Sequence, residues 1–163
     1  HPDVMRRAFS LTPEYLKTAE SDATNLMDYG VSLGRRFRAL KLWFVLRWFG
    51  REGIVEALRE HRRLALLFAA RVDDAADFER LAPVPFSVVA FRHAPPGESD
   101  PARLDRLNEE ILRRVNASGE VFLSHTRVRD RFAIRVAIGN LRTREFHVLR
   151  AWELLRAAAD GVR

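Results

Sequence analysis

The spacing of apolar residues predicts an irregular start followed by two helices. Residues 1–33 show no sustained period and contain two prolines, which is typical of loops around short helical turns. Residues 34–49 and 52–72 repeat apolar side chains at three- and four-residue intervals, and Gly50 separates the two stretches. The helix expected at 34–49 is apolar on more than one side, which indicates burial against other parts of a protein.

Shorter elements follow in the second half of the chain. β-branched and aromatic residues at 85–91 predict a strand, and residues 121–125 and 131–138 predict a hairpin. Asp100 and Thr143 are typical N-caps for two further helices. The apolar face expected for the last helix consists of Phe146, Leu149, Trp152 and Leu155. This order of elements predicts an α+β fold, an antiparallel sheet covered by helices on one face.

Length and composition fit one compact domain, or one domain with a helical extension. The 163 residues include no cysteine, which excludes disulfides and thiolate metal ligands and suggests a reducing compartment. The five histidines do not have the spacing of zinc ligands. Apolar runs such as 42–46 and 64–70 are far too short to cross a bilayer, so we expect a soluble, cytoplasmic protein. His1 in place of a methionine suggests a piece of a longer polypeptide.

The net charge of +6 comes almost wholly from arginine and raises the question of nucleic-acid binding. However, the arginines are scattered over every segment and mixed with Asp and Glu. No basic and aromatic stripe of the kind that binds RNA is present in the sequence. We therefore expect neither a nucleic-acid partner nor a membrane partner.

Arg135 is the first candidate for a binding residue. Alternation along 131–138 places the large apolar side chains on one face of the strand and Arg135 on the other, between Ala133 and Ala137. The space beside two alanines suits a carboxylate or phosphate bound by both arms of the guanidinium. Two other interpretations stay open, an ion pair with a structural acid such as Asp130 and a side chain that extends into solvent.

Three motifs taken together point to a family. They are TPEYLK at 12–17, LGRRFRALKLWF at 33–44 and RFAIR at 131–135. In order and approximate spacing they closely resemble the group II pyridoxal-phosphate decarboxylases, which include aromatic-L-amino-acid, histidine, tyrosine and glutamate decarboxylases. The second motif is too long and unusual for chance to explain well. The resemblance covers essentially the whole chain and corresponds to the C-terminal portion of such an enzyme.

The resemblance implies roles for three residues. Tyr15 falls at the mobile-loop tyrosine thought to protonate the substrate α-carbon after carbon dioxide leaves. Phenylalanine there is associated with oxidative deamination to an aldehyde, so Tyr15 favours plain decarboxylation. Gly34 falls where aromatic-amino-acid decarboxylases have glycine and histidine decarboxylases have serine, which favours a bulky aromatic substrate. Arg135 matches the arginine that meets the substrate carboxylate in glutamate decarboxylase. Residues 25–30 belong to a stretch a few residues shorter than the family's, which leaves the substrate open.

The same resemblance implies pyridoxal 5'-phosphate as cofactor, in a fold-type I homodimer with its active sites at the dimer interface. Residues 1–52 would end the large domain with its mobile loop and connecting helix, and 53–163 would form the C-terminal small domain. The Schiff-base lysine of the family lies before the loop tyrosine and is not in this chain. We therefore expect the fragment alone to be inactive and to bind no pyridoxal phosphate covalently.

Two alternatives stay open at this point. One is a free-standing, ferredoxin-like α+β module that binds a small anion or RNA through its arginines. The other is a catalytically inactive, decarboxylase-like regulatory partner. A Schiff-base lysine encoded upstream would distinguish the enzyme from the free-standing module.

Overall fold

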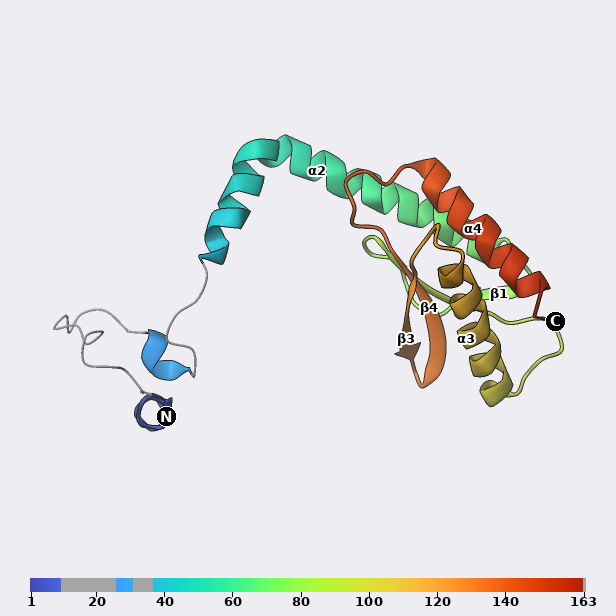
Figure 1. Ribbon diagram of the computed structural model, residues 1–163, viewed down its shortest axis with the longest axis horizontal. Helices are drawn as coiled ribbons and strands as arrows, with labels where there is room; N and C mark the ends of the chain where they lie inside the picture. The colour runs from blue at the N-terminus through green and yellow to red at the C-terminus, as the bar shows by residue number, and fades with distance from the viewer. Residues whose placement is uncertain (10–25, 31–36, 163) are drawn as a thin grey trace. The chain divides into compact units, whose positions relative to one another are not determined.

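The computed structural model describes residues 1–9, 26–30 and 37–162 (Figure 1). The chain divides into two compact units, 1–50 and 51–163. The first unit holds helix α1 (Pro2–Phe9), the short 3-10 helix η2 (Leu26–Tyr29) and the first part of helix α2 (Arg38–Asp73). Arg6 of α1 forms an ion pair with the buried Asp28 of η2, at 3.2 Å between Nε and Oδ2. Short helical turns in this region agree with the pattern of the sequence.

Helix α2 changes direction at Gly50. The residue has φ 64° and ψ 177°, a backbone conformation that is essentially restricted to glycine. The break expected at Gly50 is therefore confirmed, and helical residues lie directly on both sides of the kink. Residues 51–73 of α2 belong to the second unit, where Leu64, Phe68 and Val72 are fully buried.

Four antiparallel strands form the sheet of the second unit. They are β1 (Phe78–Arg80), β2 (Val88–His93), β3 (Ser124–Val128) and β4 (Arg131–Ala137), in the order β1-β2-β4-β3. The strand expected at 85–91 begins three residues later and extends to His93, so that Pro85, which lacks the N–H that a strand residue donates, lies outside it. The first strand of the expected hairpin is likewise shifted, from 121–125 to 124–128. β1 was not expected from the sequence.

A two-residue turn joins β3 to β4. Arg129 and Asp130 have φ values of 50° and 63°, which is the positive-φ pair that a tight hairpin turn requires. The turn fixes the register in which Val128 pairs with Arg131 and Ser124 pairs with Arg135. The register places Arg135 in β4, one of the two inner strands of the sheet.

Two further helices flank the sheet, α3 (Pro101–Ala117) and α4 (Glu145–Asp160). Asp100 caps α3 as expected, since its carboxylate accepts a hydrogen bond from the Ala102 N–H at 3.1 Å. The cap expected at Thr143 is wrong by one residue, because α4 has Arg144 at the N-cap. There the backbone N–H of Arg144 donates to His147 Nδ1 at 2.9 Å.

One hydrophobic core lies between the helices and one face of the sheet. Its members come from all three helices and from alternate positions of the strands, among them Leu64, Phe68, Ile111, Val115, Leu155, Phe78, Val89, Phe91, Phe132, Ile134 and Val136. This confirms an α+β fold with an antiparallel sheet and helices on one face. The expected face of α4 needs one correction, because Phe146 is exposed while Val148 and Ala151 face the core.

The opposite face of the sheet is called the open face below. It carries the alternate strand positions, namely Glu79, Val88, Ala90, Arg92, Ser124, Thr126, Val128, Arg131, Ala133, Arg135 and Ala137. Among the described residues, no helix contributes to this face, and the side chains there are mostly polar or small. Ala90, Arg92 and Ala133 are buried on this face, so it is open to ligands or partners mainly at Val88, Arg135 and Ala137.

Candidate functional site

Of the three site residues expected from the sequence, only Arg135 lies within the described structure. Tyr15 and Gly34 fall outside the described residues, so their roles stay predictions. Arg135 sits on β4, paired with Ala90 of β2 on one side and Ser124 of β3 on the other. Its Nε donates a hydrogen bond to Ser124 Oγ at 3.0 Å.

The surroundings of Arg135 leave its charge available. The side chain is exposed on the open face, while Phe132, Ile134 and Val136 point into the core, as the alternation predicts. Within the described part of the chain, Arg135 forms no ion pair, and the terminal nitrogens of its guanidinium have no hydrogen-bond partner. The ion pair with Asp130 that the sequence left possible is not formed. The backbone carbonyl of Asp130 accepts a hydrogen bond from Arg127, at 2.7 Å. Arg135 can therefore bind an anion with both arms.

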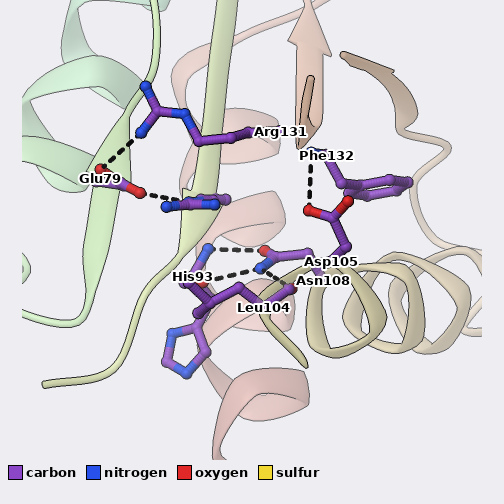
Figure 2. Close-up of polar contacts among 8 residues, drawn as sticks. Glu79, His93, Leu104, Asp105, Asn108, Arg131 and Phe132 are labelled. Carbon is purple, nitrogen blue, oxygen red and sulfur yellow. Dashed lines mark hydrogen bonds and ion pairs between the residues drawn. The ribbon is translucent and has the colours of Figure 1, made fainter. Parts of the chain in front are cut away.

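A second polar group occupies the open face near the other edge of the sheet. Glu79 of β1 forms an ion pair with Arg92 of β2 and another with Arg131 of β4, the latter at 3.8 Å (Figure 2). The carboxylate of Glu79 thus forms ion pairs with arginines of two different strands, Arg92 of β2 and Arg131 of β4. Because three arginines and one glutamate share this face, it carries an excess of positive charge.

Arg92 is the unusual member of this group. Only 7% of the residue is exposed, and its Nη1 is buried without a hydrogen-bond partner among the described residues. A buried donor without an acceptor costs about 1–3 kcal/mol of folding free energy, more for a charged group. Sequence reasoning passed over Arg92, because an arginine next to a histidine at the end of a strand has no distinctive pattern.

The buried side chain of Asn108 holds the end of β2 against α3. Its Oδ1 accepts the His93 N–H at 2.7 Å, and its Nδ2 donates to the carbonyls of His93 and Leu104 at 2.8 and 2.9 Å. Figure 2 shows this group beside a neighbouring contact, in which Asp105 accepts the Phe132 N–H at 3.0 Å. The two contacts fix α3 to β2 and β4, and so hold the strand that presents Arg135.

A third cluster joins β1 to α4 on the core side. Arg156 donates to Asp77, and its guanidinium lies 5.5 Å from the centre of the Phe78 ring. His93 Nδ1 lies 3.6 Å from the other oxygen of Asp77. Burial alone would raise the pKa of Asp77, but the hydrogen bond and charge of Arg156 outweigh it and lower the pKa below its ordinary value. This cluster is a structural ion pair, on the opposite side of the sheet from Arg135.

The described residues do not by themselves fit pyridoxal phosphate. The chain has two lysines, Lys17 and Lys41, and of these only Lys41 lies in the described part, exposed on α2 between Leu40 and Leu42. A Schiff-base lysine needs a sheltered site with groups that bind the pyridine ring and the phosphate. Within the described ranges there is no cluster of three potential metal ligands either. None of the described helices is long and apolar enough to span a membrane.

Exposed apolar side chains dominate the first part of α2. Between Phe37 and Phe49, every large apolar residue is at least one-third exposed, and Trp48 is 84% exposed. Phe37, Leu40, Trp43 and Leu46 line a shallow apolar groove there. A helix that is apolar on more than one side is typical of the interior of a larger protein.

Comparison with known proteins identifies the family. The model of the pyridoxal-dependent decarboxylase conserved domain matches residues 2–94, more than half of the chain. The chain belongs to the pyridoxal-dependent decarboxylase family. The family expected from the resemblance is thereby confirmed, and a free-standing module that binds an anion or RNA is not favoured.

The relatives in this family include decarboxylases of the aromatic amino acids tryptophan and tyrosine. The chain is 38% identical to tryptophan decarboxylase TDC2 of Camptotheca acuminata, over 99% of this chain and 33% of the relative. It is 39% identical to tyrosine decarboxylase 2 of Narcissus pseudonarcissus, over 95% and 33%. It is also 39% identical to phenylacetaldehyde synthase of Arabidopsis thaliana, over 97% and 33%. The chain thus spans about a third of the length of these relatives.

Solved structures agree with this family. Catharanthus roseus tryptophan decarboxylase in complex with L-tryptophan matches 100% of this chain and 34% of its own, with a TM-score of 0.76 and 32% identity. The structure of Oryza sativa TDC with PLP and tryptamine matches 96% and 33%, with a TM-score of 0.79 and 35% identity. Mouse CSAD, at 17% identity and a TM-score of 0.74 over 98% and 34%, shares the fold.

Proposed function

We propose that this chain is the C-terminal third of a pyridoxal-phosphate-dependent carboxy-lyase, which converts an L-amino acid with an aromatic side chain to its amine and carbon dioxide. The observation that carries the proposal is the match, over nearly the whole chain, to tryptophan and tyrosine decarboxylases at 38 and 39% identity. The fold match to tryptophan decarboxylase in complex with L-tryptophan supports the same substrate class.

In this proposal three residues of the chain act on the substrate. The bond between the α-carbon and the carboxylate breaks, carbon dioxide leaves, and Tyr15 delivers the proton that takes its place. Gly34 leaves room for the aromatic ring, because it has no side chain. Arg135 binds a carboxylate, which its uncommitted guanidinium nitrogens on the open face support.

The cofactor is held by the rest of the enzyme. When bound, pyridoxal phosphate supplies the electron sink that makes loss of carbon dioxide possible. Since the chain has no lysine in a suitable site among its described residues, we propose that the fragment alone is inactive. After incubation with pyridoxal phosphate and borohydride reduction, mass spectrometry should find no stoichiometric adduct on the isolated chain; such an adduct would contradict this part of the proposal.

The domain assignment is part of the same proposal. Residues 1–52 end the large domain, with the mobile catalytic loop and the connecting helix, and residues 53–163 form the small domain. The separation of the chain into units 1–50 and 51–163 supports this division, as do the exposed apolar residues 37–49. We further propose a cytoplasmic homodimer, which sedimentation of the full-length enzyme would test.

The experiment is an amine-release assay of the full-length enzyme with L-tryptophan, L-tyrosine, L-phenylalanine, L-DOPA and L-glutamate. We expect activity on the aromatic substrates and little on glutamate. Tyr15→Phe should lower amine release about 100-fold or more, because the proton donor is lost, and should raise oxygen consumption with aldehyde formation. Tyr29→Phe is the matched control, since Tyr29 is the only other tyrosine of this chain. Unchanged amine release in Tyr15→Phe would refute the role of Tyr15.

The role of Arg135 is tested with a change that keeps the charge. Arg135→Lys preserves the cation but not the two-armed geometry, so kcat/KM should fall about tenfold or more. Arg113→Lys is the control, because Arg113 is an exposed residue of α3 paired with Glu110. Equal activity of the two variants would exclude Arg135 from substrate binding.

A further inference from the structure

Four of the described arginines in the second unit bind carboxylates in a common way. In each ion pair, Nε and Nη2 of the guanidinium donate to the two oxygens of one carboxylate, an arrangement called side-on below. The pairs are Arg63 with Glu60, Arg80 with Asp73, Arg113 with Glu110 and Arg150 with Glu120. A carboxylate that binds side-on therefore needs Nε of the arginine.

Arg135 uses this same nitrogen for an uncharged group. Its Nε donates to Ser124 Oγ at 3.0 Å, and Ser124 is its cross-strand partner on β3. The other close positions on the open face are Ala90 on β2 and Ala133 and Ala137 on β4, whose side chains have no hydrogen-bond acceptor. Within the described part of the chain, Ser124 is thus the side chain that orients this guanidinium.

The hydrogen bond to Ser124 has two consequences for a carboxylate that approaches Arg135. Because Nε is occupied, the side-on arrangement is blocked, and Nη1 and Nη2 are left to bind the carboxylate end-on. Because a hydroxyl is uncharged, it orients the guanidinium without neutralising it, whereas an aspartate or glutamate would compete with the incoming anion. Arg135 is therefore held in one orientation and keeps its attraction for a carboxylate.

We propose that Ser124 is a positioning residue, which orients Arg135 so that Nη1 and Nη2 bind the substrate carboxylate end-on. The inference rests on the proposed function, in which Arg135 binds that carboxylate. The carboxylate loses its charge as it becomes carbon dioxide, so the ion pair is stronger in the bound substrate than in the transition state. Weakening this pair should therefore raise KM and leave kcat nearly unchanged.

The experiment compares an amino-acid substrate with its own amine, which lacks the carboxylate. L-Tryptophan and tryptamine are the pair used, or the preferred aromatic substrate and its amine. In the full-length enzyme, Ser124→Ala should raise KM for the amino acid about three- to tenfold, with kcat within about twofold of the wild type. The inhibition constant of the amine should not change, because the amine makes no contact with Arg135.

Two further variants serve as rescue and control. Ser124→Thr keeps a hydroxyl at the same position, so its KM should stay within about twofold of the wild type. Thr126→Val is the matched control, because it removes a hydroxyl from the same face of β3, at the position opposite Ala133. It should leave KM unchanged.

Ser124→Asp separates orientation from charge. An aspartate can also accept from Nε, so a role limited to holding the side chain predicts an effect no larger than that of Ser124→Ala. We expect the larger effect, a KM more than about tenfold above that of the wild type, because the new carboxylate pairs with Arg135 and competes with the substrate.

Three outcomes would overturn the proposal. The first is an unchanged KM in Ser124→Ala, and the second is an equal rise in KM and in the inhibition constant of the amine, which would show general damage to the site. The third is a smaller effect of Ser124→Asp than of Ser124→Ala.

Failure of the positioning role and failure of the proposed function give different results. Binding measured by calorimetry does not require turnover. A full-length protein without decarboxylase activity in which Ser124→Ala weakens binding of L-tryptophan but not of tryptamine would refute the function alone. An active enzyme in which Arg135→Lys raises KM and Ser124→Ala does not would refute the positioning role alone.

Discussion

The two parts of α2 share a helical spacing of apolar residues but lie in opposite environments. Residues 37–49 expose nearly all of their large apolar side chains, whereas residues 51–73 bury Leu64, Phe68 and Val72 completely. Both stretches repeat apolar residues with helical spacing, but only the second has a sheet and two helices of its own unit to pack against. An apolar pattern therefore indicates that a helix has to be buried, but it does not identify the surface against which the helix packs.

The largest expected effect comes from comparing one aromatic residue in each part. Phe68→Ala should reduce the free energy of unfolding of the chain by about 3–5 kcal/mol, because it opens a cavity beside Phe91 and Trp152, whose ring centres lie 5.2 and 5.8 Å away. Trp48→Ala should change it by less than about 0.5 kcal/mol, since Trp48 is 84% exposed. Urea unfolding measures both, and similar losses would contradict the contrast between the two parts.

A smaller effect is expected at the polar contacts of the second unit. Asn108→Ala leaves the N–H and the carbonyl of His93 without their partner inside the protein, so we expect a loss of about 1–3 kcal/mol. Asn116 makes the same two-way contact with Leu123, but it is only partly buried. Asn116→Ala should therefore cost less in urea unfolding than Asn108→Ala. The reverse order would show that burial does not set the cost.

The smallest expected effect is a pH dependence at Asp77. Its pKa is held below the ordinary value of 3.8, because Arg156 outweighs the effect of burial. The ionised carboxylate therefore stabilises the fold above about pH 4, and this contribution is lost as the pH falls through the lowered pKa. Urea midpoints between pH 6 and pH 2.5 should fall more steeply for the wild type than for Asp77→Asn. Asp130→Asn, an exposed change in the hairpin turn, should follow the wild type.

These elements show how far the sequence alone predicts this fold. Period and capping signals predicted α3 with its cap at Asp100 and the break at Gly50, because both depend on local chemistry. β1 has only three residues, too few to show a period, and it exists because it pairs with β2. Phe146 looked like a core residue by spacing, but the end of α4 where it lies is in solvent.

The candidate site likewise contains residues that the sequence predicted and residues that it did not predict. Alternation along β4 placed Arg135 on the correct face, since neighbours in one strand decide that property. The group of Glu79, Arg92 and Arg131 depends on the register of three strands, which is set by a turn and by pairing far along the chain. No local signal carries that information. The site residues Tyr15 and Gly34 remain predictions of the motif resemblance.

The backbone at Gly50 has a consequence for protein engineering and for natural variation. A Cβ there would meet no neighbouring atom, so the cost of replacing this glycine comes wholly from its φ of 64° and ψ of 177°. Every missense change at codon 50 therefore introduces the same kind of strain, whatever the size of the new side chain. The hydrophobic core of the described residues lies wholly after this point. Chimeras between members of the family can therefore be joined between Gly50 and Arg51 without dividing that core.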